Sequence, residues 1–255
     1  MVIEASDRHR EQELGLRERL SSTLCGVGSA VARRVLRGTD VCLARHAAEN
    51  FPWLKPLLTD VSAEANEAID LGRKVLVEGT QGFGLSLYHS EQYPKATSRD
   101  TTAAGFLSEV GLSPILVTEI VVVLRTFPIR VSGKQAGSFL DETDWKTIQI
   151  ESGYPHPLDE ITSVTKKTRR VGRFDWDLAS RAIVANRPTR IAVNGLDYLD
   201  YRDLAAQTRA ELSAKSVQFL SELDKFRVPV RYFGVGPKLT SVFDYIGCSI
   251  RCEVA

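Results

Sequence analysis

Hydrophobic and polar positions follow helical spacing in some stretches of the chain and form compact apolar runs in others. Residues 7–20 have the pattern of a charged amphipathic helix. A second, short helix is expected over residues 31–36, after the turn formed by Gly26-Val27-Gly28. Residues 62–71 predict a further helix with Ser62 as its N-cap.

The apolar run at residues 74–77 directly follows that helix and predicts a buried strand. Further strands are expected at residues 120–124, 129–131, 190–193 and 228–233, and further helices at residues 177–186 and 209–226. This alternation favours an α/β fold in which helices cover both faces of a mostly parallel central sheet. With 43% hydrophobic residues among 255, the chain is expected to form a single domain over residues 1–255.

The charges of the chain nearly cancel, with 33 Lys and Arg residues against 32 Asp and Glu residues. This balance argues against a protein that binds nucleic acid or a membrane surface. The most apolar run, residues 115–124, contains Glu119 and is far shorter than the roughly 20 residues that span a bilayer. Residues 1–19 are rich in charge and lack the apolar core of a secretory signal, so the expected location is the cytoplasm.

The four cysteines fit reduced thiols better than a disulfide framework; they are Cys25, Cys42, Cys248 and Cys252. Cys248 and Cys252 could form half of a metal site, but the chain has no second pair at ligand spacing. We therefore expect ordinary thiols and no metal ligands among them.

Glycines are concentrated in residues 78–84 (EGTQGFG), directly after the strand expected at residues 74–77. They permit a tight loop in which backbone N–H groups approach a ligand and Gln81 presents its amide. The segment lacks the Lys-Ser/Thr of a Walker loop, so a plain glycine-rich connection is the alternative. Downstream, residues 93–102 (YPKATSRDTT) combine hydroxyls with a cation and suit a phosphate or sugar, or a cap for a helix beginning at Ala103.

Positive charge is concentrated at residues 166–170 (KKTRR), which suit phosphate or carboxylate groups. Many charge runs are only solvated faces, but the neighbouring Gly172, Phe174 and Trp176 favour a shaped loop. Residues 190–197 form an expected strand that is followed by Asp197. A carboxylate beyond a strand end can accept two hydrogen bonds from guanine, or it can cap a helix.

Taken together, these segments resemble the adenylosuccinate synthetase family. The signature resemblance lies in residues 78–82, Tyr93-Pro94, Thr97-Ser98 and Thr101-Thr102-Ala103. Residues 125–133 (RTFPIRVSG) are similar to the short form of the family, found in archaea and in phage relatives that act on other purine nucleotides. The resemblance continues in order through Ser22-Thr23, residues 165–175 and Leu196-Asp197, and it covers about residues 3–243.

The resemblance implies a fold related to P-loop nucleoside triphosphatases, here without the N-terminal strands, and a ligase that forms homodimers. Such ligases join a 6-oxopurine nucleotide, normally IMP, to L-aspartate while hydrolysing GTP with Mg²⁺, in AMP biosynthesis. The family's phosphate loop, with its catalytic Asp and Lys, and the loop with its catalytic His correspond to positions before Met1. No catalytic residue is therefore identified in this chain, and His89 beside the binding loop does not replace that apparatus.

The resemblance also implies binding roles for individual positions. The residues that match IMP-binding positions of the family are Thr23, Arg33, Gln81, Thr97 and Lys167. Among them, Arg33 matches an arginine that reaches the nucleotide phosphate of the neighbouring subunit. Those matching aspartate-binding positions are Val131, Thr165 and Arg169, and those matching guanine-binding positions are Asp197, Gly236 and Pro237.

Two positions depart from the family. Lys167 stands in place of an arginine and cannot make its bidentate contact, and Gly195 stands where many members have a lysine packed on guanine. The identities of the purine nucleotide and of the triphosphate therefore stay open.

Three functional hypotheses follow. The first is a ligase that obtains its phosphate loop from a longer reading frame or from a separate partner chain. The second is a non-catalytic, regulatory protein that binds purine nucleotides. The third is a decayed fragment, which would expose apolar sheet edges and aggregate.

Overall fold

The computed structural model describes residues 1–163 and 165–244, which cluster into two compact units. The first unit comprises Met1–Val117 with Gln135–Gly137, and the second comprises Thr118–Lys134 with Ser138–Ala255. That the whole chain acts as one domain stays a prediction.

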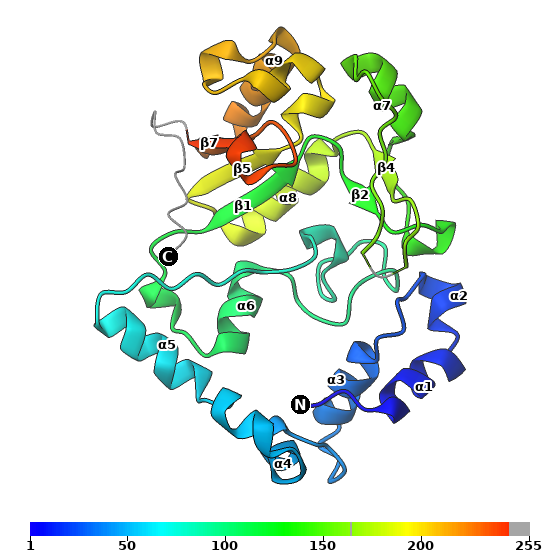
Figure 1. Ribbon diagram of the computed structural model, residues 1–255, viewed down its shortest axis with the longest axis vertical. Coiled ribbons are helices and arrows are strands. Elements are labelled where there is room, and N and C mark those ends of the chain that lie inside the picture. The colour runs from blue at the N-terminus through cyan, green and yellow to red at the C-terminus, as the bar shows by residue number, and fades with distance from the viewer. Residues whose placement is uncertain (164, 245–255) are drawn as a thin grey trace. The chain divides into compact units, whose positions relative to one another are not determined.

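The first unit is helical, and the structure describes no strand in it. Its helices are α1 (Ala5–Glu13), α2 (Leu16–Leu20), α3 (Val27–Val35), α4 (Ala44–Asn50), α5 (Val61–Asp70) and α6 (Ala103–Val110), and its 3₁₀ helices include η1 (Pro52–Leu57), η2 (Phe83–Leu85) and η3 (Pro114–Leu116) (Figure 1). Gly15, with φ of 60°, separates α1 from α2, so the single helix expected over residues 7–20 is two helices. The helix expected over residues 31–36 begins earlier than predicted, at Val27.

Two expectations for residues 60–77 are wrong. Asp60 is the N-cap of α5, since its carboxylate accepts a hydrogen bond from the N–H of Ala63 at 3.1 Å, whereas the Ser62 hydroxyl donates to the Gly111 carbonyl at 2.7 Å. Residues 74–77 form no strand, and Leu76 is 87% exposed. An apolar run becomes a strand only when a neighbouring strand satisfies its backbone groups, and no described segment pairs with this one.

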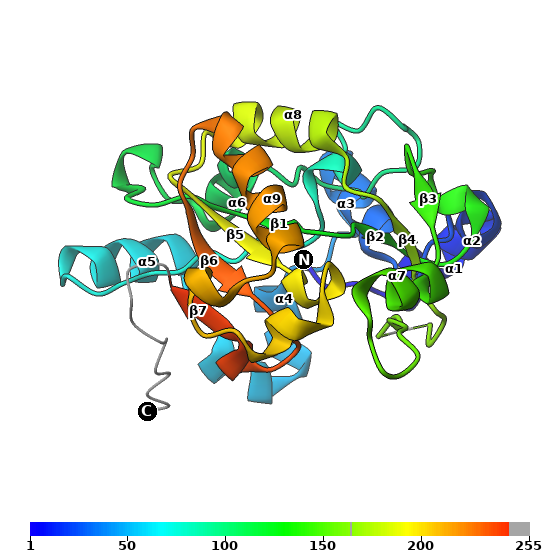
Figure 2. The ribbon, with the colours of Figure 1, turned by 90° about the horizontal axis from the view of Figure 1, so that it is seen from above.

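The second unit contains a four-stranded sheet with the order β1-β5-β6-β7. Its strands are β1 (Val121–Arg125), β5 (Arg190–Asn194), β6 (Val230–Gly234) and β7 (Val242–Asp244). The first three are parallel, and β7 pairs with β6 in the antiparallel sense (Figure 2). The expected α/β class with a mostly parallel sheet is therefore confirmed, and the strands expected at residues 120–124, 190–193 and 228–233 are present.

The described part of the second unit contains three α-helices: α7 (Trp145–Ser152), α8 (Trp176–Asn186) and α9 (Ala214–Leu223). Each begins at a side-chain N-cap, Asp144, Asp175 and Ser213 respectively, which accepts a backbone N–H in the first turn. Because Ser213 begins α9, the helix expected over residues 209–226 is shorter than predicted. Its flanks form 3₁₀ helices η7 (Arg209–Glu211) and η8 (Asp224–Phe226), and the unit also contains η5 (Leu196–Tyr198), η6 (Tyr201–Ala205) and η9 (Leu239–Ser241).

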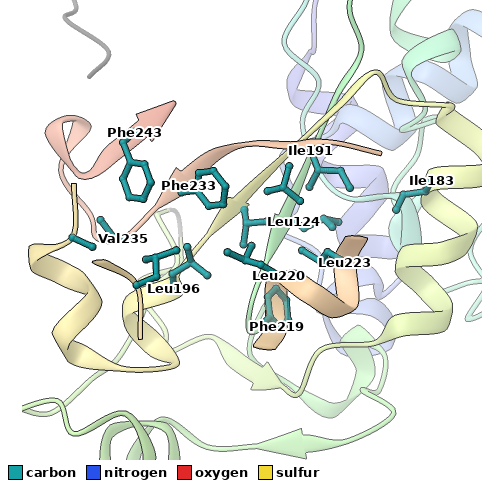
Figure 3. Close-up of a cluster of buried hydrophobic side chains, with 14 residues drawn as sticks. Leu124, Ile183, Ile191, Leu196, Phe219, Leu220, Leu223, Phe233, Val235 and Phe243 are labelled. Atoms are coloured by element: carbon teal, nitrogen blue, oxygen red, sulfur yellow. The ribbon is translucent and has the colours of Figure 1, made fainter. Parts of the chain in front are cut away.

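The main core of the second unit lies between the sheet and helices α8 and α9. Figure 3 shows Leu220 and Leu223 of α9 beside Leu124 of β1, and the cluster also includes Ile183, Ile191, Val193, Phe219 and Phe233. Burying each large apolar side chain contributes about 1.5–3 kcal/mol. This packing fixes the carboxyl ends of β5 and β6, from which residues 195–197 and 235–237 continue.

A second, three-stranded sheet has the order β2-β4-β3 and is antiparallel. Its strands are β2 (Ile129–Arg130), β3 (Glu142–Thr143) and β4 (Arg170–Gly172), and β2 is the strand expected at residues 129–131. A smaller core of Phe127, Trp145, Ile148 and Val171 supports it.

In the described part of the chain, no helix is long and apolar enough to cross a bilayer. Cys25 and Cys42 are free thiols, and Cys248 and Cys252 lie outside the described residues.

Candidate functional site

In the first unit, residues 79–102 fold back on themselves. The Thr97 N–H donates to the Leu85 carbonyl at 2.7 Å, and the Leu87 N–H donates to the Arg99 carbonyl at 3.0 Å. The Thr101 hydroxyl donates to the Gly82 carbonyl at 3.1 Å. These bonds place the segment that contains Gln81 against the segment that contains Thr97, so the structure brings two predicted IMP positions together.

Asp100 organises the turn between these two segments. Its carboxylate accepts hydrogen bonds from the Ser86 hydroxyl at 2.9 Å and from the N–H and hydroxyl of Thr102 at 3.2 and 2.5 Å. Burial opposes ionisation of Asp100, but these donors outweigh it and hold the pKa of the carboxyl below its ordinary value. This role was not predicted, because the hydroxyls of the segment suggested a bound ligand rather than an acceptor within the protein.

The glycine-rich loop packs directly on α6. A Cβ at Gly79 would lie 2.2 Å from the ring of Phe106, so only glycine allows this approach. Gln81 has φ of 70° and is exposed. His89 is exposed as well and stacks on Phe83, with ring centroids 5.4 Å apart.

The turn before α3 contacts the same segment. The buried Glu11 carboxylate accepts the N–H groups of Gly26 at 2.8 Å and Gly28 at 3.0 Å. A Cβ at Gly28 would lie 3.6 Å from the Cβ of Ser98, so the start of α3 packs beside the residue that follows Thr97. Thr23, just before this turn, is exposed. Because Glu11 already accepts these N–H groups, they are not free to bind a phosphate, and IMP binding by Thr23 stays a prediction.

The Arg33 guanidinium is bound by carboxylates of its own unit. Asp7 accepts two hydrogen bonds from its guanidinium, at 3.1 and 2.8 Å, and Glu4 forms an ion pair with it at 2.6 Å. The next arginine, Arg34, is exposed. A contact between Arg33 and the nucleotide of a neighbouring subunit stays a prediction, and it would require the guanidinium to exchange these carboxylates for a phosphate.

In the second unit, the antiparallel pairing of β2 with β4 brings the predicted aspartate positions together. Arg130 pairs with Arg170, and Val131 directly follows β2 while Arg169 directly precedes β4, so the two residues leave the sheet at the same end. The backbone of Arg169 is fixed on both sides, because its N–H donates to the Glu160 carbonyl at 2.7 Å and its carbonyl accepts the indole N–H of Trp145 at 2.8 Å.

Thr162 organises the loop that contains Thr165 and Lys167, two of the predicted binding positions. Its buried hydroxyl contacts the Thr165 hydroxyl at 2.6 Å and the N–H of Lys167 at 3.0 Å. The Thr162 N–H also donates to the Lys167 carbonyl at 2.9 Å. Thr162 therefore holds Thr165 and Lys167 in one turn, a role that no spacing signal in the sequence revealed.

Most cations around this loop are already paired. Arg125 pairs with Glu160, Arg170 with Glu142 and Arg173 with Glu151. Within the described residues, by contrast, no carboxylate lies at salt-bridge distance from Lys167 or Arg169. These two side chains are therefore available to bind an anionic ligand.

Asp197, Gly236 and Pro237 follow two adjacent parallel strands. The Gly195 N–H donates to the Gly234 carbonyl at 3.0 Å and so links the ends of β5 and β6. The Asp197 carboxylate is buried and accepts a hydrogen bond from the Tyr154 hydroxyl at 2.6 Å. Burial raises the pKa of Asp197 despite this bond. Tyr154, 43 residues away in the chain, was not predicted.

Among residues 1–163 and 165–244, no group of three His, Cys, Asp or Glu side chains is arranged to hold a metal ion.

Comparison with known proteins points to a single family. The adenylosuccinate synthetase family model matches residues 42–204. The adenylosuccinate synthetases of Methanocaldococcus jannaschii and Pyrococcus sp. are 37% and 38% identical over 244 and 245 residues, which is 95% of this chain in both cases. The chain spans only 65% and 68% of the lengths of those two relatives.

Two solved structures are also similar. The cyanophage S-2L succinoaminodeoxyadenylate synthetase, bound to dGMP and to dATP as an energy donor, has a TM-score of 0.77 and 27% identity, over 96% of this chain and 66% of that one. The adenylosuccinate synthetase of Plasmodium falciparum has a TM-score of 0.76 at 17% identity, over 94% of this chain and 74% of that one, and so shares the fold.

Proposed function

Because this chain belongs to the adenylosuccinate synthetase family, we propose that it takes part in joining IMP, or a related 6-oxopurine nucleotide, to L-aspartate with hydrolysis of GTP. In this reaction the purine oxygen accepts the γ-phosphoryl group of the triphosphate. The phosphorylated oxygen then leaves the purine as phosphate when the aspartate amino group forms the new C–N bond. The dATP in the cyanophage structure supports leaving the identity of the triphosphate open.

The observation that carries this proposal is the pair Lys167 and Arg169, whose charges have no carboxylate partner in the described chain. An arginine guanidinium matches a carboxylate in a bidentate geometry, so Arg169 suits a carboxylate of aspartate, beside Val131 and Thr165. Lys167 suits a phosphate as a point charge. In the first unit, Thr23, Gln81 and Thr97 supply hydroxyl and amide groups for the purine nucleotide.

We assign binding and orienting roles to these residues, and no transfer step. Phosphoryl transfer depends on a phosphate loop that positions and neutralises the transferred group. We propose that a further segment or a separate chain supplies it, together with the Mg²⁺ ligands, and that the protein acts as a homodimer in the cytoplasm.

The alternative proposal is a regulatory protein that binds the purine nucleotide and aspartate without turnover. It rests on the same binding positions and requires no transferable phosphoryl group.

One experiment separates the two proposals. The purified chain is mixed with IMP, aspartate, GTP and Mg²⁺, with and without the phosphate-loop segment of the M. jannaschii relative, and the succino-product is measured by mass spectrometry. The ligase proposal expects product only when the segment is added, whereas the regulatory proposal expects calorimetric binding of IMP and aspartate without product in either case. Absence of binding for both ligands would exclude both proposals.

A further inference from the structure

The Asp197 carboxylate has a hydrogen-bond donor inside its own unit. The Tyr154 hydroxyl donates to its Oδ2 at 2.6 Å, and Asp197 is only 2% exposed. Tyr154 directly follows Gly153, which ends α7 in the left-handed conformation with φ of 76°. The end of α7 therefore places the tyrosine beside the carboxyl end of β5.

The Tyr154 ring is held by other aromatic rings. Its centroid lies 4.7 Å from that of Tyr201, 6.0 Å from that of Tyr198 and 6.1 Å from that of His156, all with edge-on geometry. Tyr198 in turn packs on Trp145 at 5.8 Å. These contacts keep the hydroxyl of Tyr154 at the carboxylate.

The two purine bases make different demands on a carboxylate. Guanine presents two neighbouring donors, its ring N1–H and its exocyclic amine, which need both oxygens of the carboxylate. Adenine presents one exocyclic amine beside the acceptor N1, so one oxygen is sufficient. The tyrosine hydroxyl takes one of the two acceptor sites of Oδ2. It leaves that oxygen a weaker acceptor for the second donor of guanine, whereas the single donor of adenine needs only Oδ1.

Gly195 adds a second, independent observation. It has φ of 83°, and a Cβ there would lie 3.0 Å from Oγ1 of Thr126, whose hydroxyl donates to the Gly195 carbonyl. The position therefore resists any side chain that could stack on a guanine base.

We propose that Tyr154 determines base specificity at this site by weakening one oxygen of Asp197 as an acceptor, so that the site accepts adenine nucleoside triphosphates as readily as guanine ones. This inference rests on the proposed function, because it requires Asp197 to contact the base of the triphosphate.

The test measures the dissociation constants of GTP and ATP for the full chain by calorimetry. Tyr154→Phe removes the hydroxyl and frees Oδ2, and it is expected to shift the ratio of the two constants about tenfold in favour of GTP, the usual effect of one hydrogen bond to a charged group. Tyr201→Phe removes a hydroxyl from the same aromatic cluster without touching Asp197, and should leave the ratio unchanged. If Tyr154→Phe fails to fold, as judged by thermal unfolding, the wild-type ratio gives the test, since a preference for GTP of more than about tenfold would overturn the inference.

Asp197→Asn distinguishes the two ways in which the experiment could fail. It places an amide where guanine needs an acceptor, so it should weaken GTP binding more than ATP binding. If it does so while Tyr154→Phe leaves the ratio unchanged, the inference about Tyr154 is overturned and the base-binding role of Asp197 stands. If Asp197→Asn changes neither constant, Asp197 does not contact the base, and both the inference and that part of the proposed function are overturned.

Discussion

The fully buried Asp203 carboxylate accepts two hydrogen bonds from Ser213, from its backbone N–H at 2.6 Å and from its hydroxyl at 2.8 Å. The Ser216 hydroxyl donates to the same carboxylate. These bonds fix η6 to the first turn of α9, whose side chains form part of the core beneath β5. A buried carboxylate is stable here because each nearby donor points to it.

We expect Asp203→Asn to destabilise the second unit by about 2–4 kcal/mol, because the amide cannot accept all three bonds and leaves a buried donor unsatisfied. Urea unfolding followed by circular dichroism measures this loss in the free energy of unfolding. The exposed Asp159→Asn is the matched control and should change it by less than about 0.5 kcal/mol. Equal stabilities for the two variants would contradict the structural role of Asp203.

Gly195 and Gly153 provide a second matched pair. Both are left-handed, with φ of 83° and 76°, but a Cβ at Gly195 would lie 3.0 Å from Thr126 whereas one at Gly153 would have no atom within 4 Å. Gly153→Ala should therefore cost only the strain of a left-handed alanine, roughly 1 kcal/mol, and Gly195→Ala should cost more. Thermal unfolding of the two variants side by side gives the comparison, and a smaller loss for Gly195→Ala would show that Thr126 moves aside freely.

The sequence predicted the strands of the main sheet because strands of a parallel sheet often form short apolar runs. Residues 120–124 and 190–193 have this pattern and form β1 and β5. Residues 74–77 have the same pattern and form no strand, because pairing depends on which segments lie alongside, and hydrophobicity carries no information about that. The N-cap of α5 was misplaced for a local reason, since Asp60 and Ser62 are both good caps and the side-chain geometry chooses between them.

The candidate site could be predicted only where a residue type and a family motif coincide. The binding roles of Arg169 and Asp197 were inferred in this way and stay predictions; Arg169 directly precedes β4, and Asp197 lies in η5, which follows β5. Tyr154 and Thr162 could not be predicted, because their significance comes from the groups they contact rather than from a motif. Arg33 shows the opposite case, since no motif indicates that Asp7, 26 residues away, accepts hydrogen bonds from it.

Asp100 predicts a specific dependence of stability on pH. Its pKa in the folded protein lies below the ordinary value of 3.8, so its bonds to Ser86 and Thr102 stabilise the fold above that value. This contribution is lost as the pH falls through the lower, folded-state pKa. The difference in free energy of unfolding between the wild type and Asp100→Asn should therefore be largest near neutral pH and should shrink below about pH 4.

Urea unfolding at a series of pH values tests this dependence. Ser86→Ala removes one of the donors and should reproduce part of the effect. A difference that stays constant across the series would show that the Asp100 carboxylate does not owe its stabilising role to ionisation.

Arg169 provides the most direct test of the aspartate site. Because its guanidinium has no carboxylate partner in the described chain, replacing it with methionine breaks no ion pair and keeps much of the apolar stem. We expect Arg169→Met to raise the dissociation constant for aspartate at least about tenfold, since hydrogen bonds to charged groups contribute about 1.5–3 kcal/mol. Lys146→Met removes an exposed cation from α7 in the same unit and should leave the constant unchanged. Calorimetric titration of both variants with aspartate decides the matter: equal affinities would place the amino-acid site elsewhere, whereas a selective loss in Arg169→Met would tie the strand pairing of β2 and β4 to recognition of the substrate carboxylate.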